Sequence, residues 1–161
     1  MRFLPLVGLI LLGACVSAKS PTMSDAERRV VAEEIHQQTL GWMRADSLGD
    51  MAASLSFFVE DSEALWVSGP ALFLAGRVLH PTKASVGEWF SAFFTDGRAM
   101  RWSLGDETVA VISPDYAIQV FEGTYSIVDG LGNVGPAVPA TVTTAWVRRN
   151  GAWRILHCHQ T

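Results

Sequence analysis

The spacing of apolar residues is helical in the first part of the chain and strand-like in the second. A capping box at Ser24 and Glu27 predicts the start of a helix. The apolar stripe of this helix follows at helical spacing: Val31, Ile35 and Trp42. Gly49 is predicted to end this helix and Asp50 to cap a second, short one. A third helix is predicted to open at residues 80–82.

Strand patterns occupy most of the remaining chain. Two short strands are expected at residues 63–68 and 71–76, on either side of a turn at Gly69 and Pro70. Three longer strands follow, at residues 102–112, 116–128 and 140–148, the first with a bulge at Gly105. This order of elements predicts an α+β fold in which helices lie on one face of a curved, largely antiparallel sheet.

The chain closes with a hairpin. Asn150–Gly151 between two β-rich runs is a strong signal for a two-residue turn. Such a turn pairs Trp146 with Ile155 and Thr144 with His157. Because side chains alternate along a strand, four residues are expected on one inward face: Trp153, Ile155, His157 and His159.

Residues 1–14 have the features of a signal peptide, with a basic residue followed by a short apolar run. The sequence Leu-Gly-Ala-Cys that ends at Cys15 resembles the lipobox of bacterial lipoproteins, in which that cysteine is acylated. This interpretation predicts a lipidated tether at 15–23 and a folded domain at 24–161. The alternative is ordinary secretory cleavage after Ala18.

The residue after the lipobox cysteine is Val16 rather than an aspartate. By resemblance to lipoproteins of Gram-negative bacteria, this favours the outer membrane, with the domain facing the periplasm. Acyl chains would make the anchor stable, since each buried methylene contributes about 0.8 kcal/mol. The membrane is therefore an expected partner, through Cys15.

Composition narrows the classes of function. The formal net charge is −4, and nucleic-acid binding needs a basic face, so no nucleic-acid partner is expected. Acylation of Cys15 would leave Cys158 as the one free thiol, and we interpret it as a packed side chain. The adjacent Arg148 and Arg149 are interpreted as a solvated hairpin tip.

Three segments together resemble a known family. They are a first helix ending in Trp-x-x-Ala-Asp, a short helix Gly-Asp-Met-Ala-Ala-Ser-Leu-Ser-Phe-Phe, and a final Asn-Gly-Ala-Trp-Arg-Ile-Leu-His-Cys-His. They are similar to the SnoaL-like/DUF4440 branch of the NTF2-like superfamily over residues 24–161. The resemblance implies a cone, with a strongly curved sheet wrapped on three helices around a pocket, and homodimers formed through the outer sheet face.

Family members include isomerases, cyclases, dehydratases and non-catalytic binders, so the resemblance leaves function open. Ketosteroid-isomerase relatives need a carboxylate base near Val67, and the sequence has none there. The run Gly130–Gly135 matches a dinucleotide-binding pattern, but prolines follow it where a helix would have to begin. We therefore expect neither that isomerase activity nor a cofactor.

The candidate pocket residues are aromatic or titratable side chains placed at the interior: Trp42, Trp66, Trp89, Glu122, His157 and His159. For Glu122 the alternative of an outward, solvated side chain stays open. The two histidines suit hydrogen bonding to a ligand, acid–base catalysis, or metal binding with Glu122 as a third ligand. We expect no metal. Three functions stay open: binding of a small, mostly apolar molecule; an isomerase, dehydratase or hydrolase using His157 or His159; and an envelope interaction module acting through the outer sheet face.

Overall fold

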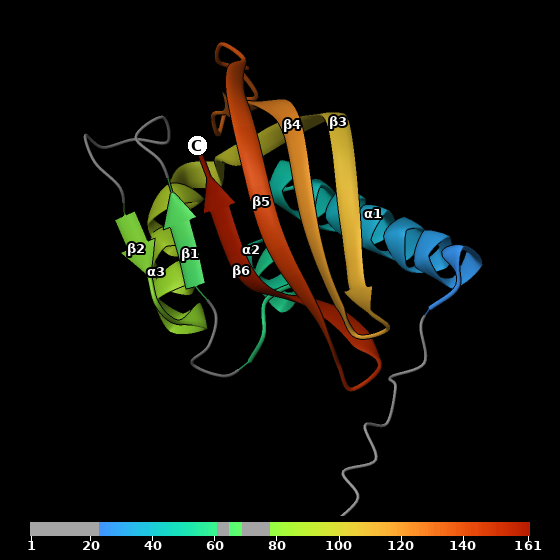
Figure 1. Cartoon of the computed structure of the whole chain (residues 1–161). Coiled ribbons are helices and arrows are strands. Elements are labelled where there is room, and N and C mark those ends of the chain that lie inside the picture. Colours follow the sequence, from blue (N-terminus) through green and yellow to red (C-terminus); the bar gives the residue numbers. More distant parts are fainter. Residues whose placement is uncertain (1–22, 61–64, 69–77) are drawn as a thin grey trace, which may run out of the picture.

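The computed structural model describes residues 23–60, 65–68 and 78–161, with only the backbone of residues 65–68 and 78 (Figure 1). The described residues contain three α-helices, α1 (Asp25–Ser47), α2 (Met51–Ser56) and α3 (Lys83–Phe93), with a short 3-10 turn, η2 (Thr95–Gly97), after the last. The strands are β1 (Leu65–Ser68), β2 (Val78–His80), β3 (Ala99–Ser113), β4 (Tyr116–Val128), β5 (Val138–Arg149) and β6 (Ala152–Gln160). The strand expected at 71–76 lies outside the described residues.

The strands form one sheet in the order β2-β1-β6-β5-β4-β3. All neighbouring pairs are antiparallel except β1 and β6, which run parallel. Figure 1 shows the long strands curving across α1, with α2 and α3 beyond its C-terminal end. The α+β class and the curved sheet on N-terminal helices, both predicted from the sequence, are confirmed.

The predicted helix boundaries follow from local hydrogen bonds. The Ser24 backbone N–H donates to Glu27 Oε2 at 2.7 Å, and the Glu27 N–H donates back to Ser24 Oγ at 3.3 Å, which completes the capping box. Gly49, with a φ of 65°, turns the chain after α1, in a backbone region that favours glycine. Asp50 then caps α2 by accepting from the Ala53 N–H at 2.9 Å.

The core lies between α1 and the inner face of the sheet. The predicted stripe of α1 is buried, and Trp42 meets Phe58 edge to face with ring centroids 6.1 Å apart. The largest fully buried side chains come from helices and strands alike: Trp42, Trp146, Tyr125, Phe58, Phe90 and Phe121. Aromatic rings therefore fill much of the space between sheet and helices.

The final strand departs from the alternation predicted for it. Close to the turn, β6 pairs with β5 as expected, and Trp146 lies opposite Ile155. The next pair joins Ala145 to His157, so Leu156 is an extra residue with no partner on β5. This arrangement is a β-bulge, and it moves every following side chain to the opposite face.

The expectation that the histidines face inward is therefore wrong. Thr144 pairs with Cys158 rather than with His157, and Cys158 and Gln160 are the buried residues of this half of β6. His157 and His159 lie half-buried on the outer face. Cys158 is a packed side chain, as interpreted from the sequence, and it lies inside the core on the face opposite the histidines.

The N-terminal predictions lie outside the described residues, because the structure describes nothing before Met23. Between Met23 and Thr161, no described helix combines the length and the apolar character needed to cross a bilayer.

The bulge leads us to predict that the Cys158 thiol is unreactive in the native protein. Its thiol is fully buried, and burial raises its pKa, so both access and thiolate formation are suppressed. In a Cys15→Ser variant, where Cys158 is the single thiol, we expect no reaction of the native protein with a thiol reagent and full reaction in 6 M guanidinium. Rapid labelling of the native protein would contradict the bulge, since regular alternation places this side chain on the outer face.

Candidate functional site

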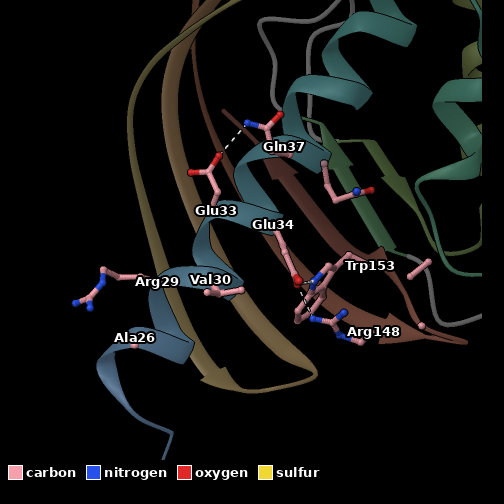
Figure 2. A pocket seen from close by; sticks show the side chains of 11 residues that line it. Ala26, Arg29, Val30, Glu33, Glu34, Gln37, Arg148 and Trp153 are labelled. Carbon is pink, nitrogen blue, oxygen red and sulfur yellow. Dashed lines mark hydrogen bonds and ion pairs between the residues drawn. The ribbon is translucent and has the colours of Figure 1, made fainter.

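A groove of about 720 Å³ lies between the N-terminal half of α1 and the β5–β6 hairpin (Figure 2). A second hollow of about 440 Å³ adjoins it on the side of the β3–β4 turn and shares four lining residues with it: Ala26, Val30, Glu34 and Arg148. Together these hollows make one two-lobed surface depression, called here the α1–hairpin groove.

A polar centre divides the two lobes. Glu34 accepts hydrogen bonds from Trp153 Nε1 at 2.8 Å and from Arg148 Nη2 at 2.5 Å. The Arg148 guanidinium also lies 4.5 Å from the centre of the Trp153 ring, in a cation–π arrangement. The hydrogen bond from the Trp153 indole N–H lowers the pKa of Glu34 most, and Arg148 lowers it further. Together they hold it below its ordinary value, although burial acts in the opposite direction. Glu34 is therefore a fixed carboxylate at neutral pH.

Apolar groups form much of the remaining wall. Val30 is 60% exposed at the groove, although it lies on a helix that packs against the sheet. Ala26 and Ala152 extend the same apolar surface, while Trp153 is only 3% exposed and lies under the Arg148 guanidinium. A concave, mostly apolar site with a few fixed polar groups is typical of small-molecule binding.

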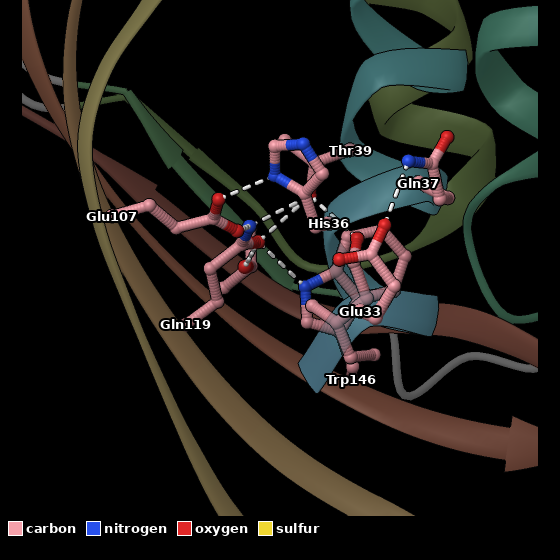
Figure 3. Close-up of polar contacts among 9 residues, drawn as sticks. Glu33, His36, Gln37, Thr39, Glu107, Gln119 and Trp146 are labelled. Atoms are coloured by element: carbon pink, nitrogen blue, oxygen red, sulfur yellow. Dashed lines mark hydrogen bonds and ion pairs between the residues drawn. The ribbon is translucent and has the colours of Figure 1, made fainter. Parts of the chain in front are cut away.

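A network of buried and half-buried polar side chains joins α1 to the sheet (Figure 3). Gln119 is fully buried, and its Oε1 accepts from Thr144 Oγ1 and Trp146 Nε1, each at 2.8 Å. Its Nε2 donates to Thr39 Oγ1 at 2.8 Å and to Glu107 Oε1 at 2.5 Å. All four hydrogen-bonding positions of the amide are thus used, which fixes α1 against three strands.

The network reaches the surface at His36. Its Nδ1 lies 2.6 Å from Glu107 Oε2, and the imidazole is about one-third exposed. Catalytic acid–base pairs also contain an imidazole that a hydrogen-bonded carboxylate holds in one orientation. However, neither His36 nor Glu107 lines the hollows described above, so this pair is best explained as a tie between α1 and β3.

Asp46 is a buried carboxyl group near the C-terminal end of α1. Its Oδ1 accepts from Ser54 Oγ, its Oδ2 accepts from Trp102 Nε1 at 3.1 Å, and Trp42 Nε1 donates in turn to Ser54 Oγ. Burial raises the pKa of Asp46 to about 7, and the two hydrogen bonds offset only part of that effect. Asp46 is therefore held partly protonated at neutral pH.

The structure places the predicted pocket residues in different surroundings. Trp42 is buried in the core, and Trp89 on α3 is partly buried and stacks on Phe93 with ring centroids 5.5 Å apart. The side chain of Trp66 lies outside the described residues. Glu122 is exposed on the outer sheet face, so the alternative in which it points outward is the one observed.

The outer position of His157 and His159 separates them from Trp42 and from the groove. Burial lowers the pKa of His157, and the neighbouring His159 lowers it further. The outer face alongside these histidines also carries Thr143 and Ala145 of β5. This geometry does not bring the two imidazoles to an interior ligand.

The residues of the α1–hairpin groove were not predicted as a site. Arg148 was interpreted as part of a solvated tip, yet its guanidinium is fixed by Glu34 and stacked on Trp153. One signal was available, because Trp153 was predicted to be inward and an inward indole needs an acceptor for its N–H. The sequence alone did not show that Glu34 supplies this acceptor from 119 residues away.

Comparison with solved structures identifies the architecture. A candidate scytalone dehydratase from Novosphingobium aromaticivorans superposes with a TM-score of 0.71 at 10% identity, covering 85% of this chain and 87% of that one. An NTF2-like superfamily protein from Salmonella enterica gives 0.66 at 15% identity, with coverages of 83% and 92%. The chain has an NTF2-like fold.

The same fold appears in the association domain of the C. elegans kinase CaMKII. It matches with a TM-score of 0.64 and 16% identity over 86% of this chain and 99% of that domain. Neither a protein-family model nor a curated protein sequence matches this chain. At these low sequence identities, the structural similarity to NTF2-like proteins establishes the fold alone. Function therefore has to be argued from the site.

The buried Asp46 predicts how stability depends on pH. Its pKa is about 7 in the folded state against an ordinary value of 3.8, so between these pH values the folded state holds a proton that the unfolded state has lost. Stability should therefore fall as pH rises through this range, by up to roughly 1.4 kcal/mol per pH unit. We expect Asp46→Asn to remove most of this slope in urea unfolding measured from pH 5 to pH 8.

The exposed Asp96 provides the control, because Asp96→Asn should keep the dependence of the unmodified protein. An Asp46→Asn protein with an unchanged slope would show that Asp46 is already ionised in the fold.

Proposed function

We propose that this NTF2-like protein binds a small, mostly apolar molecule in the α1–hairpin groove. The observation that carries the proposal is the groove itself, at about 720 Å³ with apolar walls around a fixed Glu34–Arg148–Trp153 centre. Its volume lies within the range of about 300–1,000 Å³ that is usual for ligand sites. The site expected from the sequence lay inside the cone. The site proposed here lies at the edge of the fold, between α1 and the β5–β6 hairpin.

The polar centre suits the role of orienting such a ligand. Trp153 and Arg148 hold Glu34 in one position, so its carboxylate is ordered before any ligand arrives. Arg29 and Gln37 also line the groove on the same helix, and the Gln37 amide donates to Glu33 Oε1 at 2.9 Å (Figure 2). A molecule with an apolar body and one polar end matches this arrangement.

We also propose that the protein is exported and anchored to a membrane, and this part of the proposal is argued from the sequence. We infer cleavage of residues 1–14, acylation of Cys15 and an outer-membrane position facing the periplasm. We also infer membership of the SnoaL-like branch and homodimers formed through the outer sheet face. Support for self-association comes from the same fold in the CaMKII association domain. Mass spectrometry of membrane-purified protein tests the acylation and the stoichiometry together.

The enzymatic alternative has less support. An isomerase, dehydratase or hydrolase acting through His157 or His159 would need these imidazoles beside a substrate pocket, and they lie on the outer face. The NTF2-like fold of a candidate scytalone dehydratase is compatible with catalysis but does not supply the missing geometry.

A surface substitution in the groove tests the binding proposal. Val30 is exposed on α1, so Val30→Glu should leave the fold intact while placing a second carboxylate beside Glu34. With the neutral fluorescent probe N-phenyl-1-naphthylamine, we expect saturable binding at one site per chain. Because desolvation of the new charge opposes an apolar ligand, Val30→Glu should weaken binding at least tenfold.

Leu40→Glu is the matched control, since Leu40 is a partly exposed leucine of the same helix outside the groove. Its affinity for the probe should stay within twofold of that of the unmodified chain. Equal loss in both variants, or no saturable binding at all, would remove the groove from consideration as the ligand site.

A further inference from the structure

The second lobe of the α1–hairpin groove combines an apolar floor with an excess of negative charge. Its apolar lining comes from the start of α1, from the chain just before it and from the β3–β4 turn: Met23, Ala26, Val30, Val31 and Pro114. Its charged lining consists of three carboxylates and one guanidinium: Glu27, Glu34, Asp115 and Arg148. The hollow of about 440 Å³ therefore has a formal net charge of −2 on its walls.

The positive charge in this lobe is already shared between two carboxylates. Of the described residues that line the lobe, only Arg148 is cationic. Its Nη2 lies 2.5 Å from Glu34 Oε2, and its Nε lies 3.5 Å from Asp115 Oδ1. The guanidinium also stacks on Trp153, which fixes its orientation. An anionic ligand would have to compete with both carboxylates for this group, so the lobe is a poor site for an anion.

The two carboxylate oxygens of Glu34 are used unequally. Oε2 accepts both hydrogen bonds, from Arg148 Nη2 and from Trp153 Nε1, whereas no side chain or backbone group of the described residues donates to Oε1. Glu34 lines both lobes and its side chain is 41% exposed, so a ligand in the groove can reach Oε1. A carboxylate oxygen only accepts, and a charged donor forms the stronger hydrogen bond with it.

The second guanidinium among the described groove residues, that of Arg29, does not take this position. Arg29 lines the first lobe, and Figure 2 shows its side chain directed away from Glu34. Glu33 lines the same lobe and adds a fourth carboxylate to the groove, where it accepts from the Gln37 amide. The negative charge at Glu34 Oε1 is therefore left for a ligand to meet.

We propose that the ligand of the α1–hairpin groove is a primary amine with an apolar body, bound as its ammonium ion with the charge at Glu34 Oε1. This inference rests on the binding function proposed above and specifies the class of ligand. A guanidinium is a poorer match, since its fork suits both oxygens of a carboxylate and Oε2 is already occupied. A hydroxyl group can donate to Oε1 but brings no charge to a lobe of net charge −2.

The first test is a competition series on the unmodified protein, so it does not depend on the folding of a variant. Octylamine, 1-octanol and octanoate have the same alkyl chain and are cationic, neutral and anionic at pH 7. Each is used to displace the neutral probe N-phenyl-1-naphthylamine. We expect octylammonium to bind about fivefold more tightly than 1-octanol, the upper end for an ion pair at a partly exposed carboxylate, and octanoate to bind most weakly.

The second test locates the charge that gives this preference. Glu34→Gln keeps an oxygen that can accept from the Trp153 indole N–H but removes the negative charge. The preference for octylammonium over 1-octanol should then fall below twofold. Glu33→Gln is the matched control, because it is the same substitution at the adjacent residue, whose carboxylate already accepts from Gln37. In this control the preference should stay at threefold or more.

The outcomes separate this inference from the function on which it rests. If the probe shows no saturable binding, the groove is not a ligand site and both proposals fail. If the probe binds but 1-octanol or octanoate competes as well as octylammonium, the binding function stands and the ammonium ligand is overturned. A preference that persists in Glu34→Gln, or that is lost equally in Glu33→Gln, would also overturn it, because Glu34 would then not be the residue that binds the charge.

Discussion

The amide of Gln119 determines how α1 lies on the sheet. One buried side chain hydrogen-bonds to Thr39 on α1, to Glu107 on β3, and to Thr144 and Trp146 on β5. In the low-dielectric interior these bonds reinforce one another, and a displaced helix would break the Thr39–Gln119 and His36–Glu107 contacts that join α1 to this network. The α1–hairpin groove depends on this constraint, since one of its walls is α1 and the other is the end of β5 and β6.

The helices could be predicted from the sequence because their signals are local. Ser24, Glu27, Gly49 and Asp50 act through contacts only a few residues away, and all four act in the structure as expected. The inner and outer faces of β6 could not be predicted in the same way. The bulge at Leu156 depends on pairing with β5, on the parallel neighbour β1 and on the short contact between Phe58 and Ile155, none of which leaves a local pattern.

The candidate site shows the same division between local and distant information. The sequence indicated an inward Trp153, but the partner of its indole is a glutamate 119 residues away. Glu34 and Arg148 are ordinary solvated charges when each is considered alone, and only the fold brings them together. Likewise, His80 was noted only as part of a helix start, and its burial beneath α3 depends on the position of β2 in the sheet.

The extra residue in β6 also has a consequence for how this chain can vary. Loss of Leu156 alone would restore strict alternation in β6, and the segment that follows would exchange its two sides. The imidazoles of His157 and His159 would then enter the hydrophobic core, while the thiol of Cys158 would become accessible. A single-codon deletion would thus move an inert, buried cysteine to the outer sheet face, although no remaining residue is substituted.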